Sequence, residues 1–213
     1  MYKDILIPAL KDTVFMVSYA TIFSLTLGFI CSFILVITEN KGLKPNRFIY
    51  SIFDLIVNIL RSFPFIILMI AVIPLTKIIA GKSIGRVAAI VPLTIGAFPF
   101  VARVIESALK EVDKGLIEAA KSLGATTSQI LFKVMLPEAF PSIIRGITLT
   151  IINLIGYSAM AGVIGGGGLG DVAIKYGYYR FKTDIMIYTV IVLIIIVQIV
   201  QVIGDIFYKR LSK

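Results

Sequence analysis

Four residues with small, polar or polarizable side chains recur along one apolar stretch, residues 139–163. Asn153, Gly156, Tyr157 and Met160 stand at i, i+3, i+4 and i+7, so a helix places them on one face. An amide, a phenol and a thioether on an otherwise aliphatic helix suit the passage of a small polar solute. Small and polar residues also hold membrane helices together, so spacing alone leaves both interpretations open.

The side chains that most often carry acid–base or metal chemistry are nearly absent. The chain holds no histidine and one cysteine, Cys31, which removes the commonest general base, the commonest metal ligand and any thiolate metal site. Gly-Lys-Ser at 81–83 is not a P-loop because position 76 is threonine, and the glycines of 165–170 open no βαβ unit. We therefore expect no catalytic residue, no metal and no cofactor on this chain.

The composition places these residues in a membrane. Hydrophobic residues make up 58% of the chain and charged residues 15%, whereas a typical soluble domain is about half apolar and a quarter charged. Three stretches, 13–38, 146–170 and 185–204, contain no Asp, Glu, Lys or Arg. Each is long enough to cross a bilayer, which takes roughly 20 apolar residues, and the first is too long for a secretory signal.

These stretches predict an all-α polytopic membrane protein. We expect five transmembrane helices in a single domain, 1–213, at about 13–38, 52–76, 84–104, 139–163 and 185–207. The second carries Pro64 and Pro74, and prolines inside spans need neighbouring helices to satisfy the freed backbone groups. The spans should therefore form a bundle.

Charged residues near the span ends are expected to have structural roles. Arg61 lies within the second span, where Asp54 can draw it toward the interface. Arg103 and Glu106, at i and i+3, are expected to form an ordinary interfacial pair.

We attribute the net charge of +9 to membrane topology rather than to nucleic-acid binding, because there is no contiguous basic arm. The loops on one side hold more Lys and Arg than those on the other, so the positive-inside rule puts the N-terminus outside and the C-terminus in the cytoplasm.

The connection 105–138 is long and has helical signals of its own. Asp113 fits an N-cap and Gly124 a helix stop, and between them lies one apolar stripe, Leu116, Ile117, Ala120 and Leu123. Thr127 or Ser128 should cap a second short helix that ends near Pro137. Such a hairpin is either a platform for a partner protein or an interfacial segment resting on the bundle.

The same loop carries a specific pattern. Glu118-Ala119-Ala120, three residues, Gly124, nine residues, then Val134-Met135-Leu136-Pro137 resembles the EAA loop of binding-protein-dependent ABC importer permeases. Val134 stands where that family usually has Ile. The resemblance implies a coupling helix that docks on an ATPase subunit, with the contact made by Glu118, Ala119, Ala120, Gly124, Leu136 and Pro137.

Five further motifs narrow the resemblance to the methionine-importer permeases, over nearly the whole chain: 58–65, 91–96, 156–160, 166–170 and 176–178. This implies a type I ABC importer transmembrane domain, multi-pass in the bacterial inner membrane, that forms the path for methionine (L- and also D-) by alternating access. The implied partners are a second copy of this chain as a homodimer, two ATPase subunits that hold ATP and Mg, an extracytoplasmic substrate-binding lipoprotein and the lipid bilayer.

The resemblance also assigns parts to particular residues. Met160 resembles the family's narrowing at the gate. The outer glycine loop, Gly166, Gly167, Gly168 and Gly170, either contacts the binding protein or makes a tight re-entrant turn.

Two rival functions stay open. One is an ABC permease for another amino acid or small solute. The other is an ion-coupled secondary carrier, which predicts carboxylates inside the spans, whereas Asp54 and Asp205 lie near span ends and the predicted span interiors hold no acid.

Overall fold

The computed structural model describes residues 2–212, and over that range every regular element is a helix. The two end residues of the expected domain 1–213 lie outside the described part. Four helices are long and apolar enough to cross a bilayer, and a bent pair makes a fifth. The predicted all-α membrane fold is confirmed.

The elements are α1 (Tyr2–Thr38), α2 (Arg47–Ser62), α3 (Phe65–Ala71), α4 (Ile73–Ala80), α5 (Arg86–Lys110), α6 (Lys114–Ser122), α7 (Thr127–Ile130), the π-helical turn η1 (Leu131–Met135), α8 (Leu136–Val163), α9 (Gly168–Val172), the π-helical turn η2 (Ala173–Tyr178) and α10 (Thr183–Leu211).

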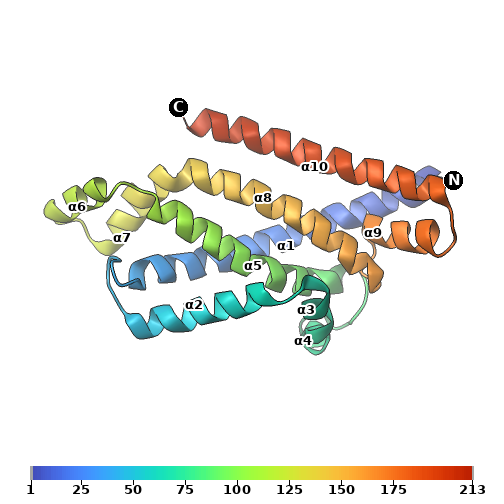
Figure 1. Ribbon diagram of the computed structural model, residues 1–213, viewed down its shortest axis with the longest axis horizontal. Coiled ribbons are helices and arrows are strands. Elements are labelled where there is room, and N and C mark those ends of the chain that lie inside the picture. Colours follow the sequence, from blue (N-terminus) through green and yellow to red (C-terminus); the bar gives the residue numbers. More distant parts are fainter. Residues whose placement is uncertain (1, 213) are drawn as a thin grey trace.

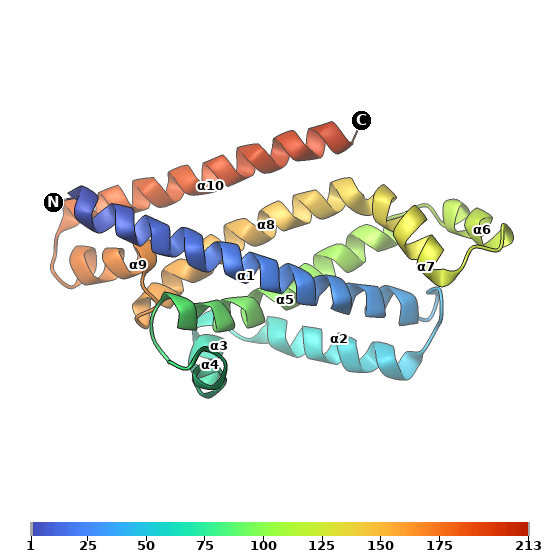
Figure 2. The same ribbon diagram turned by 180° about the vertical axis from the view of Figure 1, so that it is seen from behind.

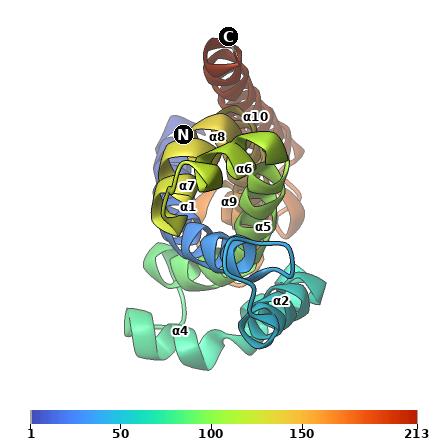
Figure 3. The same ribbon diagram turned by 90° about the vertical axis from the view of Figure 1, so that its left-hand side faces the viewer.

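Three long helices, α1, α5 and α8, form the centre of the bundle, and α5 packs against both of the others. Figure 2 shows the molecule from behind, with α1 in front, and the end view in Figure 3 places α10 on one side of this centre and α2 with α4 on the other. Glycine permits the closest approaches: a Cβ at Gly28 or Gly146 would collide with Val101 or Val104 of α5. Small residues at helix crossings are typical of membrane bundles.

Two large clusters of buried side chains make up the core. The first joins the N-terminal half of α1 to the C-terminal half of α8, with Met16, Leu93 and Leu154 fully enclosed. The second lies toward α6 and includes Leu109 and Ile143. Since lipid tails are as apolar as these side chains, close van der Waals packing, rather than escape from water, holds the helices together.

The expected second span, 52–76, is not one straight helix. α2 ends at Ser62, and the chain bends by 107° into α3. Phe63 takes an extended conformation (φ −75°, ψ 130°) because the ring of Pro64 disfavours helical geometry in the residue before it. Pro74 opens α4 instead of interrupting a span, a position where its missing N–H costs little.

Other boundaries also differ from the expected ones. α1 begins at Tyr2 rather than near residue 13, and α5 runs on past residue 104 to Lys110. The second short helix is capped by Thr126, one residue before the expected caps, through a capping box with Gln129. It does not end near Pro137; it continues through η1 into α8, whose first turn accommodates that proline.

Candidate functional site

The helix of the expected coupling loop, α6, is closed at both ends by local hydrogen bonds. The Gly115 N–H donates to the Asp113 carboxylate at 2.5 Å, so the predicted N-cap is confirmed. At the other end Gly124 has φ +77°, and the Gly124 and Ala125 N–H groups donate to the Lys121 and Ala120 carbonyls, each at 3.0 Å. This pair of bonds is a Schellman ending, which requires a left-handed residue at the glycine position.

α6 projects from one end of the molecule and has no buried residue among those described (Figure 1). Ile117 and Ala120 pack partly against the second core cluster. Leu116 and Leu123 point outward, and Leu123 is 88% exposed, so the expected single apolar stripe is divided between two faces. Glu118 and Ala119 are exposed. The exposed side chains of α6 thus offer an apolar edge, a carboxylate and a small side chain to a partner.

The last two residues of the expected coupling pattern have a different setting. Leu136, at the start of α8, packs against the second core cluster, and Pro137 is exposed in the first turn of that helix. Both lie where α7, η1 and α8 run on as one rod. Leu136 therefore contributes to holding the hairpin on the bundle.

A basic groove runs between α6 and the end of α1. It encloses about 510 Å³. Its acids are Glu39 and Glu118, and its cations are Lys41, Lys110, Lys114 and Lys121. The hollow beside α6 therefore carries more positive than negative charge.

The expected path residues on α8 do not all share one environment. Asn153, Gly156 and Met160 are exposed, and nothing lies within 4 Å of a Cβ built on Gly156. Tyr157 is half-buried, with its ring stacked on Phe65 of α3 at 4.2 Å between centroids. Tyr157 therefore has a packing role in this conformation.

The uncovered face of α8 is rotated from the expected one. Thr150, three residues before Asn153 and therefore on the expected face, is buried, and its hydroxyl donates to the Gly146 carbonyl. Arg145 and Leu149 are exposed in its place. We call the uncovered set the α8 stripe: Arg145, Leu149, Asn153, Gly156, Met160 and Val163, all exposed. Leu149 and Arg145 lie four and eight residues before Asn153, so helical spacing could also have identified them.

The outer glycine loop is packed inside the fold. Gly166, Gly168 and Gly170 are buried and Gly167 is partly so. A Cβ at Gly170 would collide with the backbone of Ala159 on α8, and Gly167 and Gly168 have φ of +84° and +82°. The geometry is that of a tight turn, and three of the four glycines offer no surface for direct contact in this conformation.

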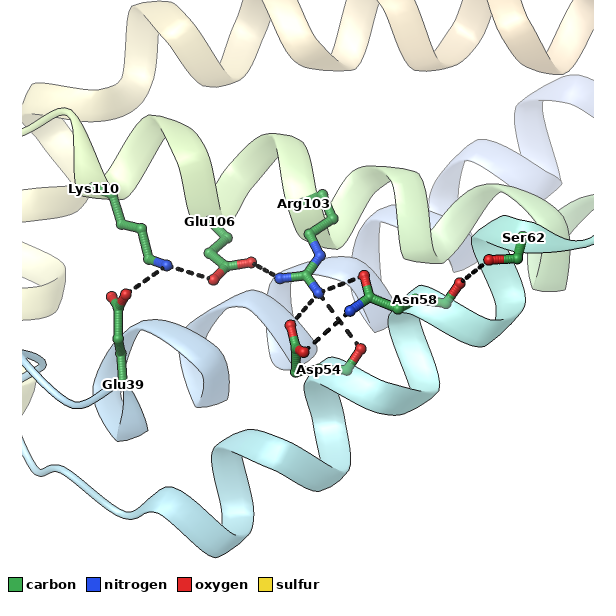
Figure 4. Close-up of polar contacts among 7 residues, drawn as sticks. All are labelled: Glu39, Asp54, Asn58, Ser62, Arg103, Glu106 and Lys110. Atoms are coloured by element: carbon green, nitrogen blue, oxygen red, sulfur yellow. Dashed lines mark hydrogen bonds and ion pairs between the residues drawn. The ribbon is translucent and has the colours of Figure 1, made fainter.

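A chain of charged and polar side chains joins α1, α2 and α5 (Figure 4). We call it the clasp: Glu39, Asp54, Asn58, Arg103, Glu106 and Lys110. Arg103 donates to Glu106 at 2.7 Å, to Asn58 at 2.8 Å and to the Asp54 carboxylate. Lys110 donates to the other oxygen of Glu106 at 2.7 Å and to Glu39 at 3.0 Å.

The clasp corrects two expectations. Asp54 pairs with Arg103 of another helix instead of drawing Arg61 toward the interface. Arg103 and Glu106 are not an isolated interfacial pair, because Glu106 is 3% exposed and lies in a network across three helices. Glu106 also lies within α5, but the predicted third span was shorter than α5 and did not include this acid. Each of its carboxylate oxygens already accepts from a cation, so it is not arranged as a free ion-binding site.

Within residues 2–212 no group of three or more His, Cys, Asp or Glu side chains is placed to hold a metal. Taken together, the helical bundle, the uncovered α8 stripe and the projecting capped helix define a membrane transport component with a docking platform at one end. The chain belongs to the family of binding-protein-dependent transport system inner membrane components, whose family model matches residues 24–213.

Similar proteins cover almost the whole chain. The probable D-methionine transport system permease protein MetI of Vibrio cholerae is 53% identical over 99% of this chain and 93% of its own. The methionine import system permease protein MetP of Bacillus subtilis is 47% identical over 84% of this chain and 81% of its own. Among solved structures, a chain of the MetNI methionine ABC transporter in an inward-facing conformation is 42% identical and superposes with a TM-score of 0.96, over 98% of this chain and 97% of that one.

Proposed function

We propose that this chain is the permease subunit of an ATP-driven importer for methionine, in its L- and D-forms, and that it forms the translocation path. The observation that carries the proposal is the projecting helix α6, closed at both ends, which leaves Glu118 and Ala119 of the coupling pattern exposed. Relatives that match over most of the chain are methionine permeases by name, which supports the substrate.

The platform transmits work from a separate motor. Two ATPase subunits, which bind ATP and Mg, dock on α6 of two copies of this chain. When nucleotide draws the ATPase subunits together, the α6 helices follow, and the bundles change from inward-facing to outward-facing. A ligand shifts such an equilibrium only through its different affinity for the two states, so the ATPase must hold α6 differently with and without nucleotide.

The α8 stripe is the proposed lining of the path. Its residues are exposed in the single chain, and a second copy related by a two-fold axis would enclose them. The likeness to an inward-facing chain supports the same state here. The α6 end then faces the cytoplasm with the C-terminus, the N-terminus lies outside, and an extracytoplasmic binding protein delivers substrate to the end that carries the glycine loop. The domain extends over the whole chain, with 105–138 as its coupling segment.

The test is uptake of labelled methionine into proteoliposomes that hold this chain with its ATPase and binding protein. We expect accumulation that requires ATP and is competed by unlabelled methionine but not by histidine or glutamine. A complex that hydrolyses ATP yet carries another solute would refute the methionine assignment and leave the importer class standing. Accumulation without any ATPase, driven by an ion gradient, would refute the class.

A further inference from the structure

A second hollow lies between α2, α5 and α8, which are coloured cyan, green and yellow to orange in Figure 1. It is an open groove of about 460 Å³, within the size range of small-molecule sites, roughly 300–1,000 Å³. Arg145 and Leu149 of the α8 stripe line it. The groove is therefore the end of the stripe nearest to α6, and a solute that follows the stripe toward α6 enters it.

The charges in this groove are of two kinds. Arg103 lines it but is already paired with Asp54 and Glu106 in the clasp. Arg61 and Arg145 also line it, and within the described residues neither has a carboxylate partner. The Arg145 guanidinium lies 4.7 Å from the centre of the Tyr208 ring, which leaves its N–H donors available.

One unpaired acid lines the same groove. Glu111, at the C-terminal end of α5, is exposed and has no cationic partner within residues 2–212. The groove thus offers two free guanidinium groups and one free carboxylate. A zwitterion carries the complementary pair, a carboxylate for the arginines and an ammonium group for Glu111.

The rest of the lining suits an apolar side chain. Phe100, Val104 and Leu149 contribute hydrocarbon surface, and Ser107 and Ser142 contribute hydroxyl groups. Unpaired charges in a membrane protein are costly and mark substrate or ion pathways. Arg61 and Arg145 have no carboxylate partner within the described residues, so an anionic ligand or water is left to neutralise them.

We propose that this groove binds the zwitterionic amino acid on the cytoplasmic half of its path, with Arg61 and Arg145 holding the carboxylate and Glu111 the ammonium group. The inference rests on the proposed function and adds a site to it. The site is open in this conformation, so it holds the substrate after it has passed the stripe and before it is released.

The test measures protection of a thiol in the groove. Cys31→Ala removes the only cysteine of the chain, and Ser142→Cys places one in the groove, with Ser107→Cys as a second probe. The permease–ATPase complex is kept in nanodiscs of zwitterionic lipid, without nucleotide or binding protein. The rate at which a soluble maleimide modifies the introduced thiol is read from the mass of the permease chain.

We expect saturating L-methionine to slow the modification about tenfold, and methioninol, which lacks the carboxylate, to leave it unchanged. Arg61→Gln or Arg145→Gln should raise the methionine concentration for half-protection about tenfold, which corresponds to about 1.4 kcal/mol. Arg61→Lys and Arg145→Lys should retain most of the protection. Arg47→Gln, an exposed arginine of α2 outside the groove, is the matched control.

The outcomes separate this inference from the proposed function. Equal protection by methioninol, or unchanged protection in both Gln variants, would overturn the proposed binding site. The proposed function would still stand in that case, provided that the wild-type complex takes up methionine. Slower modification in nanodiscs of anionic lipid, with no effect of methionine, would make the groove a lipid-headgroup site and would also overturn the inference. Absence of uptake by the wild-type complex refutes the function itself.

Discussion

Glu106 is the residue on which the clasp depends. Its side chain is 4% exposed, and its two oxygens accept from Arg103 and Lys110. Replacing this carboxylate with an amide removes one charge-assisted hydrogen bond from each cation, while Arg103 keeps its contact with Asp54 and Lys110 keeps its contact with Glu39. α2 has one fully buried apolar residue, Val57, so the polar contacts of Asp54 and Asn58 to Arg103 carry much of its attachment to α5.

We therefore expect Glu106→Gln to destabilise the permease by about 1–2 kcal/mol. The measurement is thermal unfolding of the purified chain in detergent, followed by circular dichroism. Glu138→Gln, at an exposed position of α8, is the control and should unfold as the wild type does. Equal unfolding of the two variants would show that the clasp contributes nothing to stability.

Sequence spacing found part of the clasp and missed the rest for a physical reason. Arg103 and Glu106 are three residues apart on one helix, so periodicity alone joins them. The contact of Arg103 with Asp54 crosses 49 residues of chain, and no local pattern encodes which helices become neighbours. The same limit applies to Tyr157, whose stacking on Phe65 depends on the bend that places α3 against α8.

At the scale of elements, α6 was the most predictable part. Its caps are local: Asp113 and Gly124 act within a few residues of the helix ends. The orientation of its apolar residues was less predictable, because it depends on the bundle, against whose second core cluster Ile117 and Ala120 pack. The break between α2 and α3 was also missed. Pro64 alone does not predict it, because some membrane helices continue through a proline and others end there.

The Schellman ending of α6 gives a prediction on coupling. Gly124→Ala forces a side chain into a left-handed conformation, at a cost of about 1–2 kcal/mol, and should loosen the end of the platform. We expect slower ATP-dependent uptake of methionine with normal insertion into the membrane. Uptake and ATP hydrolysis are measured on the same proteoliposomes, and hydrolysis should fall less than uptake.

A matched control exists at the opposite end of the molecule. Gly81 ends α4 with φ +71°, and nothing lies within 4 Å of a Cβ built there, as at Gly124. Gly81→Ala imposes the same backbone strain away from the platform and should keep uptake near the wild-type rate. If both variants lose uptake equally, the effect is general destabilisation and the coupling role of Gly124 is refuted.

At the scale of the whole molecule, two kinds of exposed surface need different surroundings. α10 has a long series of exposed aliphatic residues, among them Ile191, Ile194, Ile195 and Ile199, which suits contact with lipid tails. The α8 stripe mixes Arg145, Asn153 and Gly156 with apolar residues, and an exposed arginine or amide facing hydrocarbon would be expensive. The stripe therefore requires water or a second copy of the chain opposite it.

The arrangement as a two-fold dimer predicts which position approaches its own copy. Met160 lies on the α8 stripe and is 45% exposed, whereas Ile195 lies on α10 and is 51% exposed.

In a Cys31→Ala background, Met160→Cys should form a disulfide between two permease chains under a mild oxidant, because residues on a two-fold axis meet their own equivalents. Ile195→Cys, equally accessible but facing lipid, should stay monomeric on a non-reducing gel of the assembled complex. Under the proposed alternating access, ATP with vanadate, which mimics the transition state of hydrolysis, should weaken the Met160→Cys link, because a change to the outward-facing state would separate the two α8 helices. Cross-linking at Ile195→Cys without any at Met160→Cys would place the interface on α10 and remove the α8 stripe from the path.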